Sequence, residues 1–145
     1  MNAQPTEILL VEDNPDDVEL TLRALSTHNL TNRIKVVSDG AEALDYLRPD
    51  DGEHPPADGY PKLVLLDLKL PRVGGIEVLR RLKASERTRL IPVVVMTSSR
   101  EEIDLVASYK YGANSYIVKP VDFEQFMKAV GVLGLYWMLF NEVPR

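Results

Sequence analysis

The chain has 145 residues, of which 45% are hydrophobic and 27% charged, a size and composition that fit one compact domain with a buried core and exclude a disordered chain. It contains no cysteine, which excludes disulfide bonds, thiolate metal sites and a catalytic cysteine. Its net charge of −5 opposes binding to a phosphate backbone, so we expect no direct contact with DNA.

Five short apolar runs divide the chain. Most of them are rich in β-branched residues and nearly continuous in apolar character, which is typical of strands that are covered on both faces. The predicted strands cover residues 8–11, 34–37, 63–66, 92–96 and 116–118.

Segments with helical periodicity follow these runs. In the first, Val18, Leu22 and Leu25 recur at spacings of four and three, with Asn14 as the expected N-cap and Pro15 at the first helical position. Further helices are predicted over about 41–47, 75–84, 101–111 and 123–133, and the proline-rich stretch 48–62 is predicted to be a connecting loop. This alternation of strand and helix predicts an α/β protein with a doubly wound, five-stranded parallel sheet.

Polar side chains directly follow four of the predicted strands. In open α/β sheets, ligand sites lie beyond the carboxyl ends of the strands, so we expect these side chains to converge. They are Glu12 and Asp13 after the first strand, Asp67 after the third, Thr97 and Ser98 after the fourth, and Lys119 after the fifth.

The carboxylates in this group predict a site for a divalent cation. Clustered carboxylates repel one another and therefore take up a proton or a cation, and a set of oxygen ligands favours Mg²⁺, with Mn²⁺ as a substitute. A carboxylate beside such an ion can attack a phosphoryl group, whose charge Lys119 and Thr97 would offset. Each residue alone has an ordinary explanation as a cap, turn residue or surface charge. Their coincidence at successive strand ends favours the site.

The same residues carry a resemblance to a known family. The chain resembles the bacterial two-component response-regulator receiver family over nearly its whole length. The segments that carry the resemblance are Glu12-Asp13-Asn14, 65–71 around Asp67, Gly74-Gly75, Thr97-Ser98, Gly112-Ala113 and Lys119-Pro120. Within that family, the chain is most similar to the single-domain response regulators of bacterial and cyanobacterial phytochromes. The residues that indicate this are 11–15, 113–116, the proline-containing loop and the aromatic C-terminal segment.

This resemblance implies a flavodoxin-like (βα)5 three-layer sandwich with strand order 2-1-3-4-5, in a single receiver domain over 1–145 with its core at about 7–140. It implies that the chain is no conventional enzyme. Instead, Asp67 would accept a phosphoryl group from a sensor histidine kinase in a phytochrome-type pathway, with Mg²⁺ as the cofactor, and would lose that group slowly.

The resemblance also assigns the metal ligands. Asp13 and Asp67 would bind Mg²⁺ directly, together with the backbone carbonyl of Lys69, and Glu12 would contribute through a water molecule. The side chains of Lys69 and Ser99 would flank the water that attacks the phosphorylated Asp67, so both would tune the lifetime of that state.

A second set of residues would respond to the phosphoryl group. Lys119 would pair with the phosphoryl oxygens, and its bond to Pro120 would be cis. Thr97 and Ser98 would contact the phosphoryl group, and Tyr116 would rotate into the space that Thr97 leaves. The alternative for Tyr116 is a static, half-buried strand aromatic.

The last predicted helix has more apolar surface than one domain needs. Residues 130–140 are apolar all round, whereas a surface helix normally shows one apolar stripe. The stretch is too short to cross a bilayer, and residues 1–6 do not resemble a signal peptide, so we expect a cytoplasmic protein. We expect a homodimer through the fourth and fifth helices and the fifth strand, with Tyr136, Trp137 and Phe140 on the dimer surface. Packing of this helix into its own domain is the alternative.

Because few residues remain outside the domain, we expect output through protein binding. Two alternatives stay open for the activity. One is a phosphorelay shuttle or phosphate sink. The other is a Mg²⁺-dependent phosphatase of the haloacid-dehalogenase type, which also forms an aspartyl phosphate but normally has a second acid where this chain has Lys69.

Overall fold

The computed structural model describes residues 7–26, 34–51, 54–56, 59–98 and 110–131. The predicted helix over 101–111 falls almost entirely outside the described residues, as do Ser99, Tyr136, Trp137 and Phe140. The described elements are, in chain order, β1 (Ile8–Val11), α1 (Pro15–Ser26), β2 (Ile34–Val37), α2 (Gly40–Leu47), β3 (Leu63–Asp67), α3 (Gly75–Ala84), β4 (Val93–Thr97), β5 (Ser115–Val118) and α5 (Phe123–Gly131).

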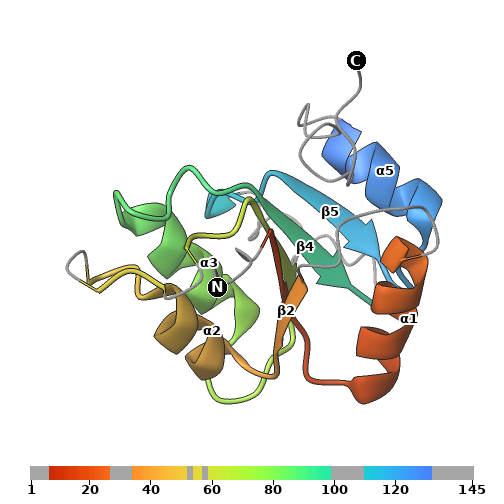
Figure 1. Cartoon of the computed structure of the whole chain (residues 1–145), viewed down its shortest axis with the longest axis horizontal. Helices are drawn as coiled ribbons and strands as arrows, with labels where there is room; N and C mark the ends of the chain where they lie inside the picture. The colour runs from red at the N-terminus through yellow and green to blue at the C-terminus, as the bar shows by residue number, and fades with distance from the viewer. Residues whose placement is uncertain (1–6, 27–33, 52–53, 57–58, 99–109, 132–145) are drawn as a thin grey trace, which may run out of the picture.

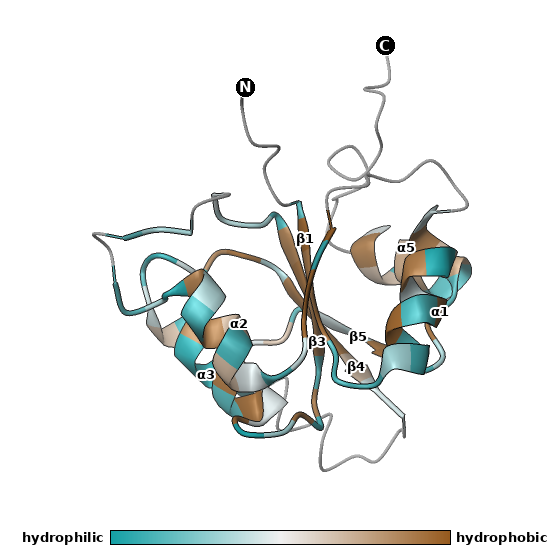
Figure 2. Ribbon diagram, turned by 60° about the horizontal axis from the view of Figure 1, so that its bottom comes forward, coloured by the Kyte–Doolittle hydropathy of each residue, from teal (hydrophilic) through white to brown (hydrophobic). Residues whose placement is uncertain are grey.

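The strands form one parallel sheet in the order β2-β1-β3-β4-β5, which confirms the predicted topology. Helices α2 and α3 cover one face of the sheet, and α1 and α5 cover the other (Figure 1). Viewed along the sheet, the three layers are separate and the strands are the most apolar part of the molecule (Figure 2). This is the doubly wound arrangement expected from the alternation of strands and helices.

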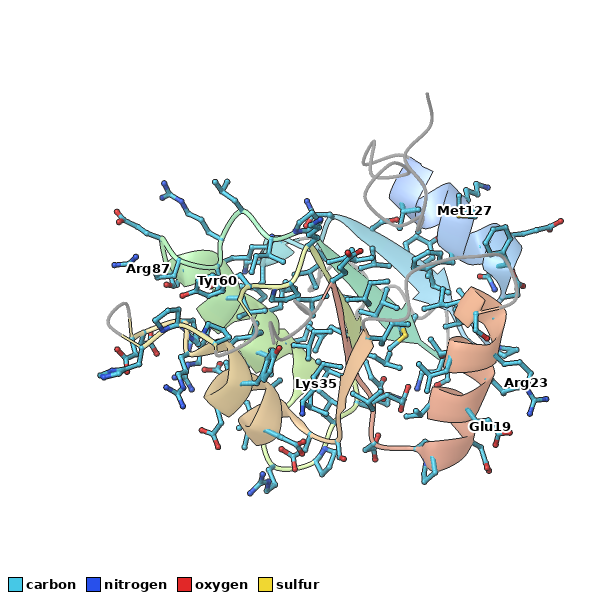
Figure 3. The ribbon with its side chains drawn as sticks, viewed as in Figure 1. Glu19, Arg23, Lys35, Tyr60, Arg87 and Met127 are labelled. Carbon is cyan, nitrogen blue, oxygen red and sulfur yellow. The ribbon has the colours of Figure 1, made fainter. Side chains whose placement is uncertain are left out.

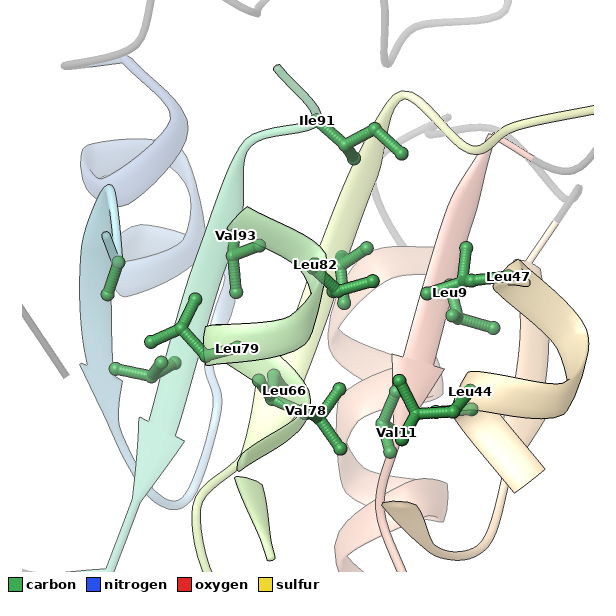
Figure 4. Close-up of a cluster of buried hydrophobic side chains, with 14 of the residues drawn as sticks. Leu9, Val11, Leu44, Leu47, Leu66, Val78, Leu79, Leu82, Ile91 and Val93 are labelled. Carbon is green, nitrogen blue, oxygen red and sulfur yellow. The ribbon is translucent and has the colours of Figure 1, made fainter. Parts of the chain in front are cut away.

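The strands have no polar face because both faces are covered. Successive side chains of a strand point to opposite faces, so the apolar runs supply two cores at once. Leu9 and Leu66 pack under α2 and α3 (Figure 4), whereas Leu10 and Leu65 pack under α1 and α5. All four side chains are fully buried.

The start of α1 has the predicted cap. Oδ1 of Asn14 accepts hydrogen bonds from the backbone N–H groups of Asp16 at 2.8 Å and Asp17 at 3.2 Å. The outer face of α1 carries an ion pair between Glu19 and Arg23, both of which point away from the sheet (Figure 3). The cap fixes the first turn of the helix beside the carboxyl end of β1.

The proline-rich stretch 48–62 contains no helix or strand in its described residues, as predicted. The first residues of this loop are nevertheless attached to α3 and to the residue that follows it. Arg81 pairs with Asp50 at 2.8 Å, and the Ser85 hydroxyl donates to the carbonyl oxygen of Pro49. Nowhere in the described ranges is a helix both long and apolar enough to pass through a bilayer.

Candidate functional site

Backbone hydrogen bonds continue beyond the ends of the strands and position the site residues. Directly after β1, the N–H of Glu12 donates to the carbonyl of Val37 at 3.0 Å. Directly after β5, the N–H of Lys119 donates to the carbonyl of Thr97 at 2.8 Å. Glu12 and Lys119 therefore lie one residue beyond their strands with their backbones still hydrogen-bonded to the neighbouring chain segment, at the place where ligand sites of this architecture lie.

The three predicted metal-binding carboxylates converge. One carboxylate oxygen from each of Glu12, Asp13 and Asp67 lies within 4.8 Å of the others. Glu12 and Asp67 are only 2% and 3% exposed, whereas Asp13 faces solvent. The backbone N–H of Lys69 donates to Oδ1 of Asp67 at 3.2 Å, so residue 69 also lies at the site, although its side chain is exposed. An oxygen-only donor set with one solvent-facing member fits Mg²⁺ or Mn²⁺, which usually keep several waters.

Lys119 forms ion pairs with three carboxylates at this edge of the sheet. Its Nζ lies 2.8 Å from Oε1 of Glu12, 3.1 Å from Oδ2 of Asp17 and 3.2 Å from Oδ2 of Asp67. Its peptide bond to Pro120 is cis, as the resemblance implies. One ammonium thus partly neutralises three carboxylates, and the excess negative charge that remains favours binding of a cation.

This crowding shifts the pKa values of two groups. Burial raises the pKa of Glu12 to about 7; the hydrogen bond with Lys119 opposes this rise, and the neighbouring Asp67 adds to it. Burial lowers the pKa of Lys119, but its contacts with Glu12, Asp67 and Asp17 outweigh that effect and raise it above its ordinary value. Lys119 therefore stays a cation near neutral pH, while Glu12 holds a proton more readily than an ordinary glutamate does.

The predicted switch residues lie on β4 and β5. Thr97 ends β4 and is 3% exposed, and Ser98, the next residue, is exposed. Tyr116 pairs across the sheet with Val95 and is 37% exposed, while its neighbour Ile117 is buried. Thr97 is thus buried, and Tyr116 is partly exposed.

The loop between β3 and α3 is held in place by contacts that sequence reasoning missed. Arg72 has φ 63°, and both its Nε and its Nη2 donate to the carboxylate of Asp39 at 3.0 Å. Gly75 approaches β3 so closely that an added Cβ would lie 2.3 Å from the carbonyl oxygen of Asp67. The Gly74-Gly75 pair was a visible signal of such an approach, whereas nothing in the sequence paired Arg72 with Asp39.

The response regulator receiver domain family matches residues 8–131 of the chain. The chain belongs to this family. Receiver domains are signalling regulators rather than conventional enzymes, so the dehalogenase-type alternative loses its support. The five-stranded sheet in the order 2-1-3-4-5 agrees with this membership.

Individual receiver proteins resemble the chain over nearly its whole length. The probable methanogenesis regulatory protein FilR2 of Methanothrix harundinacea is 45% identical, over 97% of this chain and 88% of its own. The structure of the bacteriophytochrome response regulator AtBRR is 55% identical, with a TM-score of 0.82, over 97% of this chain and 100% of its own. Response regulator Rcp1 of Synechocystis is 36% identical, over 97% of this chain and 94% of its own. Its Mn²⁺-bound structure has a TM-score of 0.72, over 97% of this chain and 100% of its own.

Proposed function

We propose that this receiver is a phosphorylation switch in which Asp67 accepts a phosphoryl group from a phosphohistidine of a sensor kinase. The observation that carries the proposal is the convergence of Glu12, Asp13 and Asp67 within 4.8 Å, with the Lys119 ammonium 3.2 Å from Asp67. A nearly buried carboxylate beside a cation site and a fixed ammonium suits attack on phosphorus.

In the transfer, a carboxylate oxygen of Asp67 forms a bond to phosphorus as the bond from phosphorus to the histidine nitrogen breaks. The departing nitrogen keeps the electron pair of that bond. Asp13, Asp67 and the backbone carbonyl of Lys69 would hold Mg²⁺, with Glu12 contributing through water. When bound, the ion supplies positive charge for the phosphoryl oxygens. Lys119, which is already held at the site, stabilises the same charge without further ordering.

The phosphoryl group then acts on β4 and β5. In this proposal the hydroxyl of Thr97 moves to donate to a phosphoryl oxygen, and Ser98 contacts the same group. Tyr116 turns inward into the space that Thr97 leaves. The support is the starting arrangement, in which Thr97 is buried and Tyr116 is 37% exposed.

Intact-mass spectrometry tests the phosphorylation. The protein is mixed with acetyl phosphate and Mg²⁺, and one phosphoryl group should be added. Asp67→Asn should abolish the gain in mass, whereas Asp45→Asn, a matched change at an exposed residue of α2, should leave it intact. Addition of a phosphoryl group to the Asp67→Asn protein would contradict the assignment.

We also propose that the partner kinase is a phytochrome, because AtBRR is described as a bacteriophytochrome response regulator and is 55% identical to this chain. Such a pair would act in the cytoplasm. The test is transfer of radiolabelled phosphate from a purified bacteriophytochrome kinase of the same organism. Transfer should be faster than from an unrelated kinase of that organism. Equal rates would contradict the pairing, and onward transfer to a histidine phosphotransfer protein would indicate a phosphorelay shuttle instead.

Output is proposed to be protein binding through a homodimer that involves β5 and α5. Tyr116 on β5 supports this, because it is a large side chain that the described part of the domain leaves 37% exposed. Sedimentation at tens of micromolar, with and without phosphorylation, should detect a dimer. A monomer under both conditions would contradict the proposal.

A further inference from the structure

Lys119 has a third carboxylate partner that lies outside the metal-binding group. Oδ2 of Asp17, in the first turn of α1, accepts a hydrogen bond from Nζ of Lys119 at 3.1 Å. The two residues are 102 positions apart in the sequence. Asp17 is partly shielded, with 28% of its side chain exposed, and the Lys119 side chain is only 13% exposed.

The partners of Lys119 differ in what phosphorylation does to them. Glu12 and Asp67 belong to the group of three carboxylates that can hold a cation, so a bound ion competes with Lys119 for their oxygens. When Asp67 becomes an acyl phosphate, the negative charge moves from its carboxylate oxygens to the phosphoryl oxygens, so the contact of Lys119 has to move as well. Among the described residues, Asp17 is the ion-pair partner of Lys119 that lies outside this group, so a cation held by the group does not require its carboxylate.

The position of Asp17 is itself fixed. Its backbone N–H donates to the side chain of Asn14, and this cap holds the first helical turn. A lysine has a long flexible stem, so an ammonium whose other contacts change during the reaction is better ordered when one contact stays in place. Asp17, held by the cap and in contact with Lys119, can provide such a contact.

We propose that Asp17 is a positioning residue that keeps the Lys119 ammonium directed at Asp67 while a cation and a phosphoryl group occupy the site. This inference rests on the proposed function, in which Lys119 pairs with the phosphoryl oxygens. Asp17 is not one of the three carboxylates that can hold the cation, and in this proposal it acts through Lys119 alone. It acts by reducing the disorder of Lys119, since pre-positioned charge stabilises a developing anion better than mobile charge does.

The test compares Asp17→Ala with Asp16→Ala. Both substitutions remove one carboxylate from the first turn of α1. Among the described residues, the ion-pair partners of Lys119 are Glu12, Asp17 and Asp67, so the comparison with Asp16 cancels the general effect of the lost charge. At saturating Mg²⁺ and acetyl phosphate, Asp17→Ala should be phosphorylated about fivefold more slowly than Asp16→Ala. Affinity for beryllofluoride, a non-covalent mimic of the phosphoryl group measured by calorimetry, should fall by a similar factor.

The conservative variant separates positioning from charge. Asp17→Asn keeps an acceptor oxygen for Lys119, so it should recover most of the rate and of the beryllofluoride affinity. Equal rates for Asp17→Ala and Asp16→Ala would overturn the inference, as would rates equally low in Asp17→Ala and Asp17→Asn. If the unsubstituted protein acquired no phosphoryl group, the proposed function itself would fail, and the two failures are therefore distinguishable.

Discussion

At the scale of single residues, the site depends on how one ammonium is shared among carboxylates. Lys119 lies within 3.2 Å of three carboxylates, and Glu12 among them is almost completely buried. Sequence reasoning placed Lys119 at this edge because it follows a strand. It did not place Asp17 there, because the α1 face on which Asp17 lies depends on the packing of that helix against the sheet.

The raised pKa of Glu12 predicts that Mg²⁺ affinity depends on pH. Below about pH 7 the metal-free site holds a proton on Glu12, which a bound cation must displace, so the affinity rises with pH and levels off above this value. Calorimetric titration with Mg²⁺ between pH 5.5 and 8.5 measures this, in steps of about half a unit. Glu12→Gln should flatten the dependence, and an equally steep profile in that variant would contradict the role of Glu12.

The raised pKa of Glu12 also affects the free energy of unfolding. This free energy should fall as the pH rises, whereas the Mg²⁺ affinity should increase. Between its ordinary pKa of 4.5 and about 7, Glu12 in the metal-free fold keeps a proton that the unfolded chain has released. Its contribution to the free energy of unfolding therefore falls as the pH rises through this window. Urea denaturation of the protein and of Glu12→Gln, without metal, should differ in slope against pH there. Parallel curves would show that Glu12 does not carry the effect.

Lys69 gives a prediction about the lifetime of the phosphorylated state. Its backbone lies at the site, and its exposed side chain starts two residues beyond Asp67. The side chain would flank the attacking water, so Lys69→Ala should change the rate of hydrolysis of the aspartyl phosphate. Decay of the phosphorylated mass after removal of acetyl phosphate measures this rate, and Lys62→Ala, a change at an exposed lysine before β3, is the control. Unchanged decay would remove Lys69 from this role.

At the scale of elements, the loop from β3 to α3 determines how well Asp67 is positioned. The loop starts after Asp67, carries Lys69, and ends where Gly75 packs against the backbone of β3. The arginine–aspartate pair between Arg72 and Asp39 attaches it to the start of α2. Such contacts between loops depend on the three-dimensional path of the chain, so periodicity and strand ends could not reveal them.

Adjacent glycines offer a matched test of this loop. An added Cβ at Gly75 would lie 2.3 Å from the carbonyl oxygen of Asp67, whereas one at Gly74 would meet nothing within 4 Å. Gly75→Ser should therefore cost about 1–3 kcal/mol of unfolding free energy. Gly74→Ser, at the N-cap of α3, should change it by less than about 0.5 kcal/mol. Similar denaturation midpoints for the two variants would mean that the close approach of Gly75 to the backbone of Asp67 does not contribute to stability.

At the scale of the whole molecule, a sheet buried on both faces holds the edge on which the site is built. The continuous apolar runs predicted this architecture, the strand order agreed with the resemblance, and most predicted boundaries lie within one residue of the observed ones. Convergence of Glu12, Asp13, Asp67 and Lys119 was predictable for the same reason, since parallel strands end at the same edge. The predicted helix over 101–111 and the dimer surface of Tyr136, Trp137 and Phe140 stay predictions, because almost all of the helix and all three of these residues lie outside the described residues.

The central measurement is anomalous diffraction from crystals grown with Mn²⁺, which reveals the ion directly. Because Glu12, Asp13 and Asp67 are gathered within 4.8 Å, the account predicts one ion bound by the carboxylates of Asp13 and Asp67, with the backbone carbonyl of Lys69 as the third protein ligand. Crystals of Asp13→Asn should show a much weaker ion. No ion at this edge, or an ion bound elsewhere on the chain, would contradict the account.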